Sequence, residues 1–126
     1  MTTYLLAGGG TAGHVNPMLA IADALSERDP QARIICVGTA EGLEAQLVPE
    51  RGYELITIPR IPFPRIRGFF SSSRRFIAGW PQAVKTITQL LKDREVDVVV
   101  GVGGYSAAPA YAAARKAGIP FVIHEA

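Results

Sequence analysis

Residues 8–17 read GGGTAGHVNP, and this glycine-rich segment follows the apolar run YLLA at residues 4–7. A strand that ends in a glycine-rich turn and leads into a helix is typical of phosphate-binding sites, because glycines allow positive φ angles and close approach of the backbone. We expect Asn16 to be the N-cap of the helix and Pro17 its first residue, where the missing N–H is not needed. His14 lies within the segment, and histidine is the side chain that changes charge near neutral pH.

Other interpretations of the glycine spacing remain open. Gly8, Gly10 and Gly13 fit the dinucleotide pattern G-x-G-x-x-G, but the acidic residue expected after the second strand is missing, since that strand ends in CVGT at residues 36–39. The segment also lacks the Lys-Ser/Thr ending of a P-loop. A purely structural turn would let the helix pack on the sheet, but it would not explain His14.

The composition is that of one soluble or peripheral globular domain. The chain has 126 residues, of which 48% are hydrophobic, and its net charge of +2 does not by itself indicate a nucleic-acid-binding protein. Cys36 is the single cysteine, so an internal disulfide is excluded, and its apolar neighbours predict a core position. No apolar run of the sequence approaches the roughly 20 residues of a membrane span.

Apolar runs and helical stripes alternate along the chain, which predicts an α/β fold: a Rossmann-like open parallel sheet with helices on both faces. A second glycine loop, GVGGYS at residues 101–106, follows the fourth expected strand. Both glycine loops should therefore lie at the carboxyl edge of the sheet, where such folds bind ligands. Pro81 should kink the third helix or move its start later. The expected strands are 3–7, 33–37, 53–58, 96–100 and 121–123, and the expected helices are 17–28, 42–48, 73–94 and one ending near 116.

Four segments together resemble the N-terminal half of the MurG family. They are the GGGTAGHVNP loop, VGT at residues 37–39 followed by LE at 43–44, DVVVGVGGY at 97–105 and IPFVIHE at 119–125. The resemblance covers essentially the whole chain in the same order. Members of this family are bacterial transferases that add N-acetylglucosamine to lipid I.

The resemblance implies half of a two-domain GT-B glycosyltransferase. Residues 1–126 would form one Rossmann-like acceptor-binding domain, and the C-terminal sugar-nucleotide domain would be absent from this chain, which alone should be inactive. The implied reaction moves N-acetylglucosamine from UDP-GlcNAc to lipid I, with inversion, to make lipid II for peptidoglycan. Two alternatives remain: a non-catalytic membrane-docking partner of a split glycosyltransferase, and a module that binds NAD or ATP.

The resemblance also assigns residues to the implied site. His14 is the candidate general base for the muramyl 4-hydroxyl, or else a hydrogen-bond donor that transfers no proton. The expected donor-binding residues are Thr11, Ala12 and Gly13, and the expected acceptor- and diphosphate-binding residues are Gly9, Gly10, Gly103, Gly104, Tyr105 and Glu125. No metal site and no cofactor are expected, because two separated histidines are not a ligand set.

Residues 60–80 combine basic and aromatic side chains. They hold five arginines and no acidic residue, although the whole chain has 13 basic and 11 acidic residues. Such a segment suits an anionic membrane surface, so we expect a peripheral protein on the cytoplasmic face of the bacterial cell membrane. Alternatively, Phe76 and Trp80 belong to the helix core. No nucleic-acid partner is expected, since no reader motif is present. The candidate membrane residues are Arg65, Arg67, Phe69, Phe70, Arg74, Arg75, Phe76 and Trp80.

Overall fold

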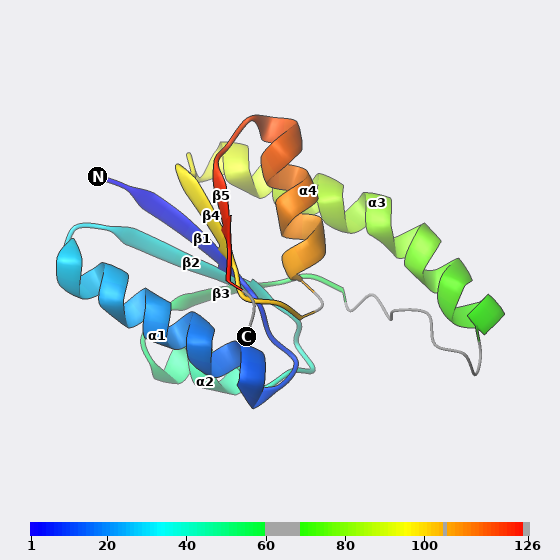
Figure 1. Ribbon diagram of the computed structural model, residues 1–126, viewed down its shortest axis with the longest axis horizontal. Coiled ribbons are helices and arrows are strands. Elements are labelled where there is room, and N and C mark those ends of the chain that lie inside the picture. Colours follow the sequence, from blue (N-terminus) through cyan, green and yellow to red (C-terminus); the bar gives the residue numbers. More distant parts are fainter. Residues whose placement is uncertain (60–68, 105, 125–126) are drawn as a thin grey trace.

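The structure is a computed structural model that describes residues 1–59, 69–104 and 106–124, with the backbone alone described for residues 69–78. Its centre is a parallel sheet with the strand order β3-β2-β1-β4-β5 (Figure 1). All four neighbouring pairs are parallel, which confirms the predicted open parallel sheet. The strands are β1 (Thr3–Ala7), β2 (Arg33–Gly38), β3 (Glu54–Thr57), β4 (Val98–Gly101) and β5 (Phe121–Ile123).

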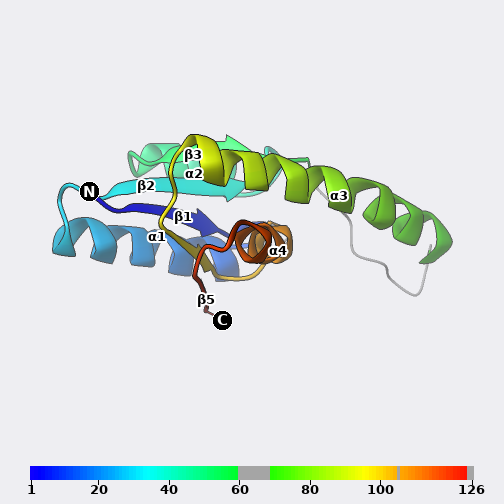
Figure 2. The same ribbon diagram turned by 90° about the horizontal axis from the view of Figure 1, so that it is seen from above.

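Helices cover both faces of this sheet, as the sequence predicted. α1 and α2 lie on one face, and α3 and α4 lie on the other (Figures 1 and 2). Residues along a strand alternate between two hydrophobic clusters, because successive side chains point to opposite faces. Leu5 of β1 packs with α3 and α4, whereas the next residue, Leu6, packs with α1 and α2. The helices are α1 (Ala12–Arg28), α2 (Glu44–Glu50), α3 (Phe69–Asp93) and α4 (Ala107–Ala117).

The apolar stripes predicted for the two long helices face the sheet. In α1, Met18 and Ala22 are fully buried, and Ile21 and Leu25 pack against the same cluster. In α3, the predicted positions Val84, Ile87 and Leu91 belong to the cluster on the other face. The 3- and 4-residue spacing of these side chains therefore identified the core side of each helix correctly.

The predicted start of α1 was wrong. Thr11, not Asn16, is the N-cap residue: its backbone is extended, with φ −121° and ψ 163°, and the helix begins at Ala12. Pro17 lies inside the helix and not at its first position. A proline there removes one backbone hydrogen bond to the residue four positions earlier, which is Gly13. The earlier start places His14 in the first helical turn.

The predicted start of α3 was also wrong, because the helix begins at Phe69 and continues through Pro81. α3 connects β3 to β4, so its N-terminal end lies toward the carboxyl edge of the sheet. Figures 1 and 2 show this end projecting well beyond the strands. In the part of the chain that the structure describes, no helix is both long enough and apolar enough to cross a membrane.

The strand order changes direction at β1. The chain passes from β1 to β2 and β3 on one side, and then returns to place β4 on the other side of β1. Loops that leave two such neighbouring strands in opposite directions open a crevice at their carboxyl ends. The loop after β1 is the first glycine loop (residues 8–11). The loop after β4 is the second glycine loop, which starts at residue 102 because Gly101 is the last residue of β4.

Candidate functional site

The two glycine loops touch one another at the carboxyl edge of the sheet. A Cβ built on Gly104 would overlap the carbonyl oxygen of Gly9 and would lie 2.9 Å from its nitrogen. Gly104 has a φ of 93°, in the left-handed region that favours glycine. Only a residue without a side chain therefore allows the loops to approach this closely.

A buried hydroxyl ties the second loop to the first. Ser106, which is 1% exposed, donates from Oγ to the carbonyl oxygen of Gly8 at 3.2 Å or to that of Val37 at 3.1 Å. These two carbonyls belong to the ends of neighbouring segments, since the Gly8 nitrogen itself donates to Val37 oxygen at 3.4 Å. Ser106 therefore holds the ends of β1 and β2 together from the start of α4.

His14 lies between the two loops. Its Nδ1 is 3.4 Å from Oγ1 of Thr11 in the first loop. On the other side of the ring, a Cβ on Gly103 would lie 2.9 Å from Cδ2 and 3.0 Å from Nε2. The imidazole therefore spans the contact between the loops, half-buried, with one nitrogen toward Thr11 and the other toward Gly103.

The start of α1 presents backbone donors at the same place. Thr11, Ala12 and Gly13 are all exposed, and the Thr11 side chain makes no capping hydrogen bond. The Thr11 carbonyl accepts from the nitrogens of His14 and Val15 at 3.0 Å each. Because the first four N–H groups of a helix have no intrahelical acceptor, the amides of Ala12 and Gly13 suit an anion or a hydroxyl.

A buried carboxylate forms a hydrogen bond with the backbone of the first glycine loop. Glu44, the first residue of α2, is 1% exposed. Its Oε1 accepts from the Gly10 nitrogen at 3.0 Å, and its Oε2 accepts from the Thr39 nitrogen at 2.7 Å and from Thr39 Oγ1 at 3.3 Å. The amide of Gly10 is thus bonded within the protein, so within this arrangement Gly10 shapes the loop and offers no N–H to a ligand.

The structure brings together most of the residues that the sequence assigned to a site. Thr11, His14 and the two pairs of loop glycines converge at one edge. Tyr105 and Glu125 lie outside the described residues, as do Arg65 and Arg67. For Phe69, Phe70, Arg74, Arg75 and Phe76 only the helical backbone is described, and Trp80 is half-buried in α3.

Glu44 and Ser106 were missed as site residues. Cβ atoms on Gly9, Gly38 and Gly42 would each overlap the Glu44 side chain, but these glycines become its neighbours only in the folded chain. Gly38 is the last residue of β2, and Gly42 lies in the turn before α2. Ser106 was predicted only as part of the second glycine loop, with no role of its own.

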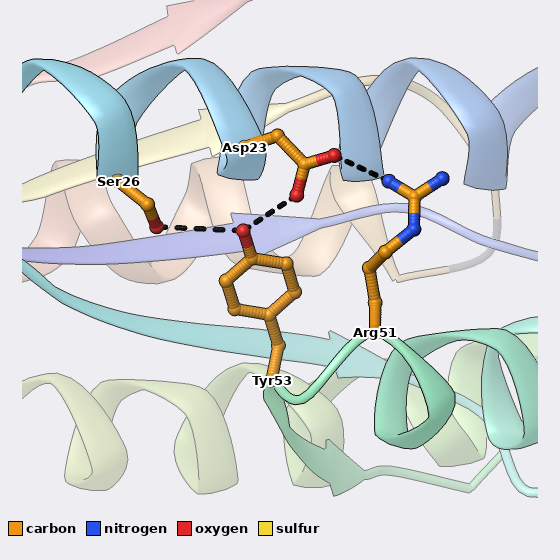
Figure 3. A network of polar contacts seen from close by, with 4 residues as sticks. All are labelled: Asp23, Ser26, Arg51 and Tyr53. Carbon is orange, nitrogen blue, oxygen red and sulfur yellow. Dashed lines mark hydrogen bonds and ion pairs between the residues drawn. The ribbon is translucent and has the colours of Figure 1, made fainter.

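Polar networks away from the glycine loops serve the fold. Asp23 of α1 accepts from the Tyr53 hydroxyl at 2.6 Å and forms an ion pair with Arg51, and Ser26 Oγ lies 3.4 Å from the same hydroxyl (Figure 3). Burial, followed by the hydrogen bond to Asp23, raises the pKa of Tyr53 above its usual value. Among the described residues, no group of three or more His, Cys, Asp or Glu side chains could hold a metal ion.

The comparisons with known proteins agree with this geometry. The glycosyltransferase family 28 N-terminal domain matches residues 4–126. A relative from Leifsonia xyli, a UDP-N-acetylglucosamine--N-acetylmuramyl-(pentapeptide) pyrophosphoryl-undecaprenol N-acetylglucosamine transferase, is 58% identical over the whole chain. The crystal structure of Acinetobacter baumannii MurG superimposes with a TM-score of 0.78 at 29% identity, over 99% of this chain. The resemblance to the MurG family is thereby confirmed.

A more distant structure shares the fold alone. LpCGTa in complex with UDP has a TM-score of 0.72 at 16% identity, covering 99% of this chain and 30% of its own. Together with MurG it supports the assignment to the Rossmann-like half of a GT-B glycosyltransferase. The chain spans 35% of the length of both the Leifsonia relative and the Acinetobacter structure. Nothing in these comparisons favours a separate membrane-docking subunit.

Proposed function

Because the chain belongs to the glycosyltransferase family 28 N-terminal domain family, we propose that it is the acceptor-side domain of an inverting transferase that moves N-acetylglucosamine from UDP-GlcNAc to lipid I. The observation that carries the proposal is the position of His14 between two glycine loops at the switch in strand order. Open parallel sheets bind their ligands there. A second, sugar-nucleotide domain would complete the cleft, since the chain spans about a third of its relatives.

His14 acts in this proposal as the general base. When Nδ1–H donates to Thr11 Oγ1, the lone pair of Nε2 is free to accept the proton of the muramyl 4-hydroxyl. The hydroxyl oxygen then forms its bond to the anomeric carbon while the bond to UDP breaks on the opposite side. Thr11 thus helps to orient the His14 ring, as a third group orients the base in other catalytic sets.

The surrounding backbone binds the phosphates. Ala12 and Gly13 are exposed, and their amides lie at the positive end of the α1 dipole, where negative charge is favoured. They would contact the donor in the closed cleft, and Gly103 and Gly104 of the second loop would contact the diphosphate of the acceptor. Tyr105 and Glu125 are proposed to extend the acceptor side of the site. Gly9 and Gly10 would contribute the shape of the first loop.

We place the protein at the cytoplasmic membrane surface, where a lipid-linked acceptor is found. The N-terminal end of α3 projects beyond the sheet at the same edge as the glycine loops (Figures 1 and 2). The sequence gives this end two phenylalanines and two arginines, at positions 69, 70, 74 and 75. Apolar groups flanked by cations suit an anionic bilayer. The partners proposed are therefore lipid I, UDP-GlcNAc and the membrane.

The reaction is tested in a complete enzyme. A chimera joins this chain to the remaining two thirds of the Leifsonia relative, and transfer from labelled UDP-GlcNAc to a lipid I analogue is measured. We expect transfer by the chimera, and a kcat lower by about 10²–10⁴-fold in His14→Gln with little change in KM. An inactive chimera that is folded would overturn the transferase assignment. An active His14→Gln chimera would overturn only the role of the histidine.

Membrane binding needs its own experiment. Liposomes that contain about 30 mol% anionic lipid are sedimented with the unmodified chain or with a variant. The variant carries Phe69→Ser, Phe70→Ser, Arg74→Glu and Arg75→Glu. We expect the variant to remain in the supernatant. Equal sedimentation of the two proteins would remove the membrane claim and leave the transferase proposal standing.

A further inference from the structure

Among the residues that the structure describes, Glu44 is a charged residue buried in the core. The buried polar side chains are those of Thr3, Thr39, Glu44 and Ser106, and Glu44 is the charged member of this set. Burying a carboxylate is costly unless hydrogen bonds replace its water. The structure supplies three such donors, and all of them come from the loops that follow β1 and β2. The mechanism above makes no use of this carboxylate.

The space around Glu44 is built for its side chain. Three glycines line it, and a Cβ on Gly9, Gly38 or Gly42 would overlap the carboxylate or its methylene group. These glycines belong to three separate segments: the first glycine loop, the end of β2 and the turn before α2. Gly9 is held at a φ of 145°, a conformation that side chains rarely adopt. The cradle and its occupant therefore depend on each other.

The first glycine loop is held by side chains at two points. Ser106 donates to the carbonyl oxygen of Gly8, and Glu44 accepts from the nitrogen of Gly10. Gly10 is followed directly by Thr11, the N-cap of α1, whose hydroxyl faces His14. The position of the Gly10 amide thus sets where α1 begins, and with it the position of the imidazole against Gly103.

We propose that Glu44 is a positioning residue of the transferase: its carboxylate fixes the Gly9–Gly10 turn and thereby aims Thr11 and His14 at the acceptor. Glu44 touches no substrate and acts through the backbone of the first glycine loop. The catalytic consequence rests on the proposed function, whereas the hold on the loop does not. A shift of about 1 Å in a catalytic group is enough to lower a rate by about 10²-fold.

Glu44→Gln tests this hold with almost no change in volume. Each carboxylate oxygen accepts one backbone N–H, so the amide of glutamine, which keeps a single oxygen, leaves one N–H without an acceptor. Oε2 has the shorter bond and two donors on Thr39, and the glutamine oxygen is expected to remain there. The NH2 group then faces the Gly10 nitrogen, and the loop is released at that point.

Glu41→Gln is the matched control. Glu41 is exposed and lies three residues earlier in the same turn, so the change removes the same charge without touching the cradle. Thr39→Val is a second variant, which removes the 3.3 Å hydroxyl bond to Glu44 and keeps the backbone bond. It should weaken the hold on the Thr39 side and leave the Gly10 bond in place.

Amide hydrogen exchange of the chain gives a readout that needs no activity. In Glu44→Gln we expect the Gly10 amide to exchange at least about tenfold faster, while amides of the buried strands, such as Leu6 and Val37, keep their rates. Loss of stability alone would speed exchange across the sheet as well. Unchanged protection of Gly10, or equal acceleration everywhere, would overturn the proposal.

The chimera gives the catalytic readout. We expect Glu44→Gln to lower kcat about tenfold or more and to leave KM for UDP-GlcNAc within about twofold, whereas Glu41→Gln keeps both values. A released Gly10 amide with an unchanged kcat would also overturn the positioning role. If the unmodified chimera transfers no sugar, the proposed function fails, and exchange at Gly10 still decides whether Glu44 holds the loop.

Discussion

The backbone of Gly104 rests on the backbone of Gly9. A Cβ on Gly104 would lie 2.9 Å from the Gly9 nitrogen and would overlap its carbonyl oxygen. This contact joins the loop after β4 to the loop after β1, and His14 is placed against the same pair of loops. The closeness of two backbones is therefore what makes one site from two distant segments.

Gly104→Ala is expected to separate the loops. The substitution adds strain at a φ of 93°, which costs on the order of 1–3 kcal/mol, and it adds the overlap with Gly9. Gly52→Ala is the matched control, since Gly52 has a φ of 87° and nothing within 4 Å of its Cβ position. Urea unfolding followed by circular dichroism should show a larger loss for Gly104→Ala. Equal losses would mean that the loops yield to a methyl group.

Tyr53→Phe should weaken the link between α1 and the α2–β3 turn. The change removes the 2.6 Å bond to Asp23 and the contact with Ser26, and the expected loss in unfolding free energy is about 0.5–1.5 kcal/mol. The folded pKa of Tyr53 is raised, so this stabilisation is complete below the usual tyrosine pKa of about 10 and is lost as the pH rises through the folded value. Unfolding at pH 7 and at pH 11 measures both effects. A difference between the two proteins that grew at high pH would contradict the assignment.

Cys36 is expected to react only when the chain unfolds. Its side chain is fully buried, and burial raises the pKa of its thiol to about 12. At pH 8 about one thiol in ten thousand would then be a thiolate, the form that attacks disulfide reagents. Labelling with a thiol reagent should therefore follow global unfolding in urea, and the single cysteine makes the signal unambiguous. Rapid labelling of the native chain would show that the α1 side of the sheet opens locally.

The pair of Glu54 and Arg94 should give a stability term that depends on pH and salt. Arg94 donates to both carboxylate oxygens of Glu54, at 3.0 and 2.8 Å, and this hydrogen bonding lowers the pKa of Glu54. Because the folded pKa is lowered, the pair stabilises the protein at pH values above the unfolded pKa of about 4.3. This stabilisation is lost as the pH falls through the folded pKa.

The free energy of unfolding of the unmodified chain is compared with that of Arg94→Gln from about pH 3 to about pH 6, at low and high salt. Both side chains are well exposed, so the difference in unfolding free energy should be small. It should become smaller still in about 1 M salt. A difference that persists at high salt would indicate packing by the arginine stem and not an ion pair.

Periodicity predicted the layers of this fold well. The stripe containing Met18 and Ala22, and the one containing Ile87 and Leu91, lie against the two faces of the sheet as expected. The helix starts were harder, because more than one residue can end a loop. Asn16 before Pro17 is a favourable N-cap, and Thr11 is one as well. Local residue preferences alone therefore do not choose between the two helix starts.

The candidate site could be predicted only as far as its loops. The glycine pairs and His14 each lie within a short segment, and the sequence of that segment alone indicates a binding turn. Glu44 bonds to Gly10, which is 34 residues away, and this neighbour is known only once β2 is placed beside β1. Strand order follows from the packing of the whole chain, so side chains that act across strands were beyond the reach of local patterns.

The central place of β1 has a consequence for synthesis on the ribosome. β1 and α1 emerge early, but the Thr3–Asp97 bond closes a span of 94 residues and the Ser106–Gly8 bond one of 98. Such distant pairings are slow to form, because the intervening chain must be ordered first. Until β4 leaves the exit tunnel, one edge of β1 has no native neighbour, and a nascent chain stalled before that point would be a natural target for chaperones.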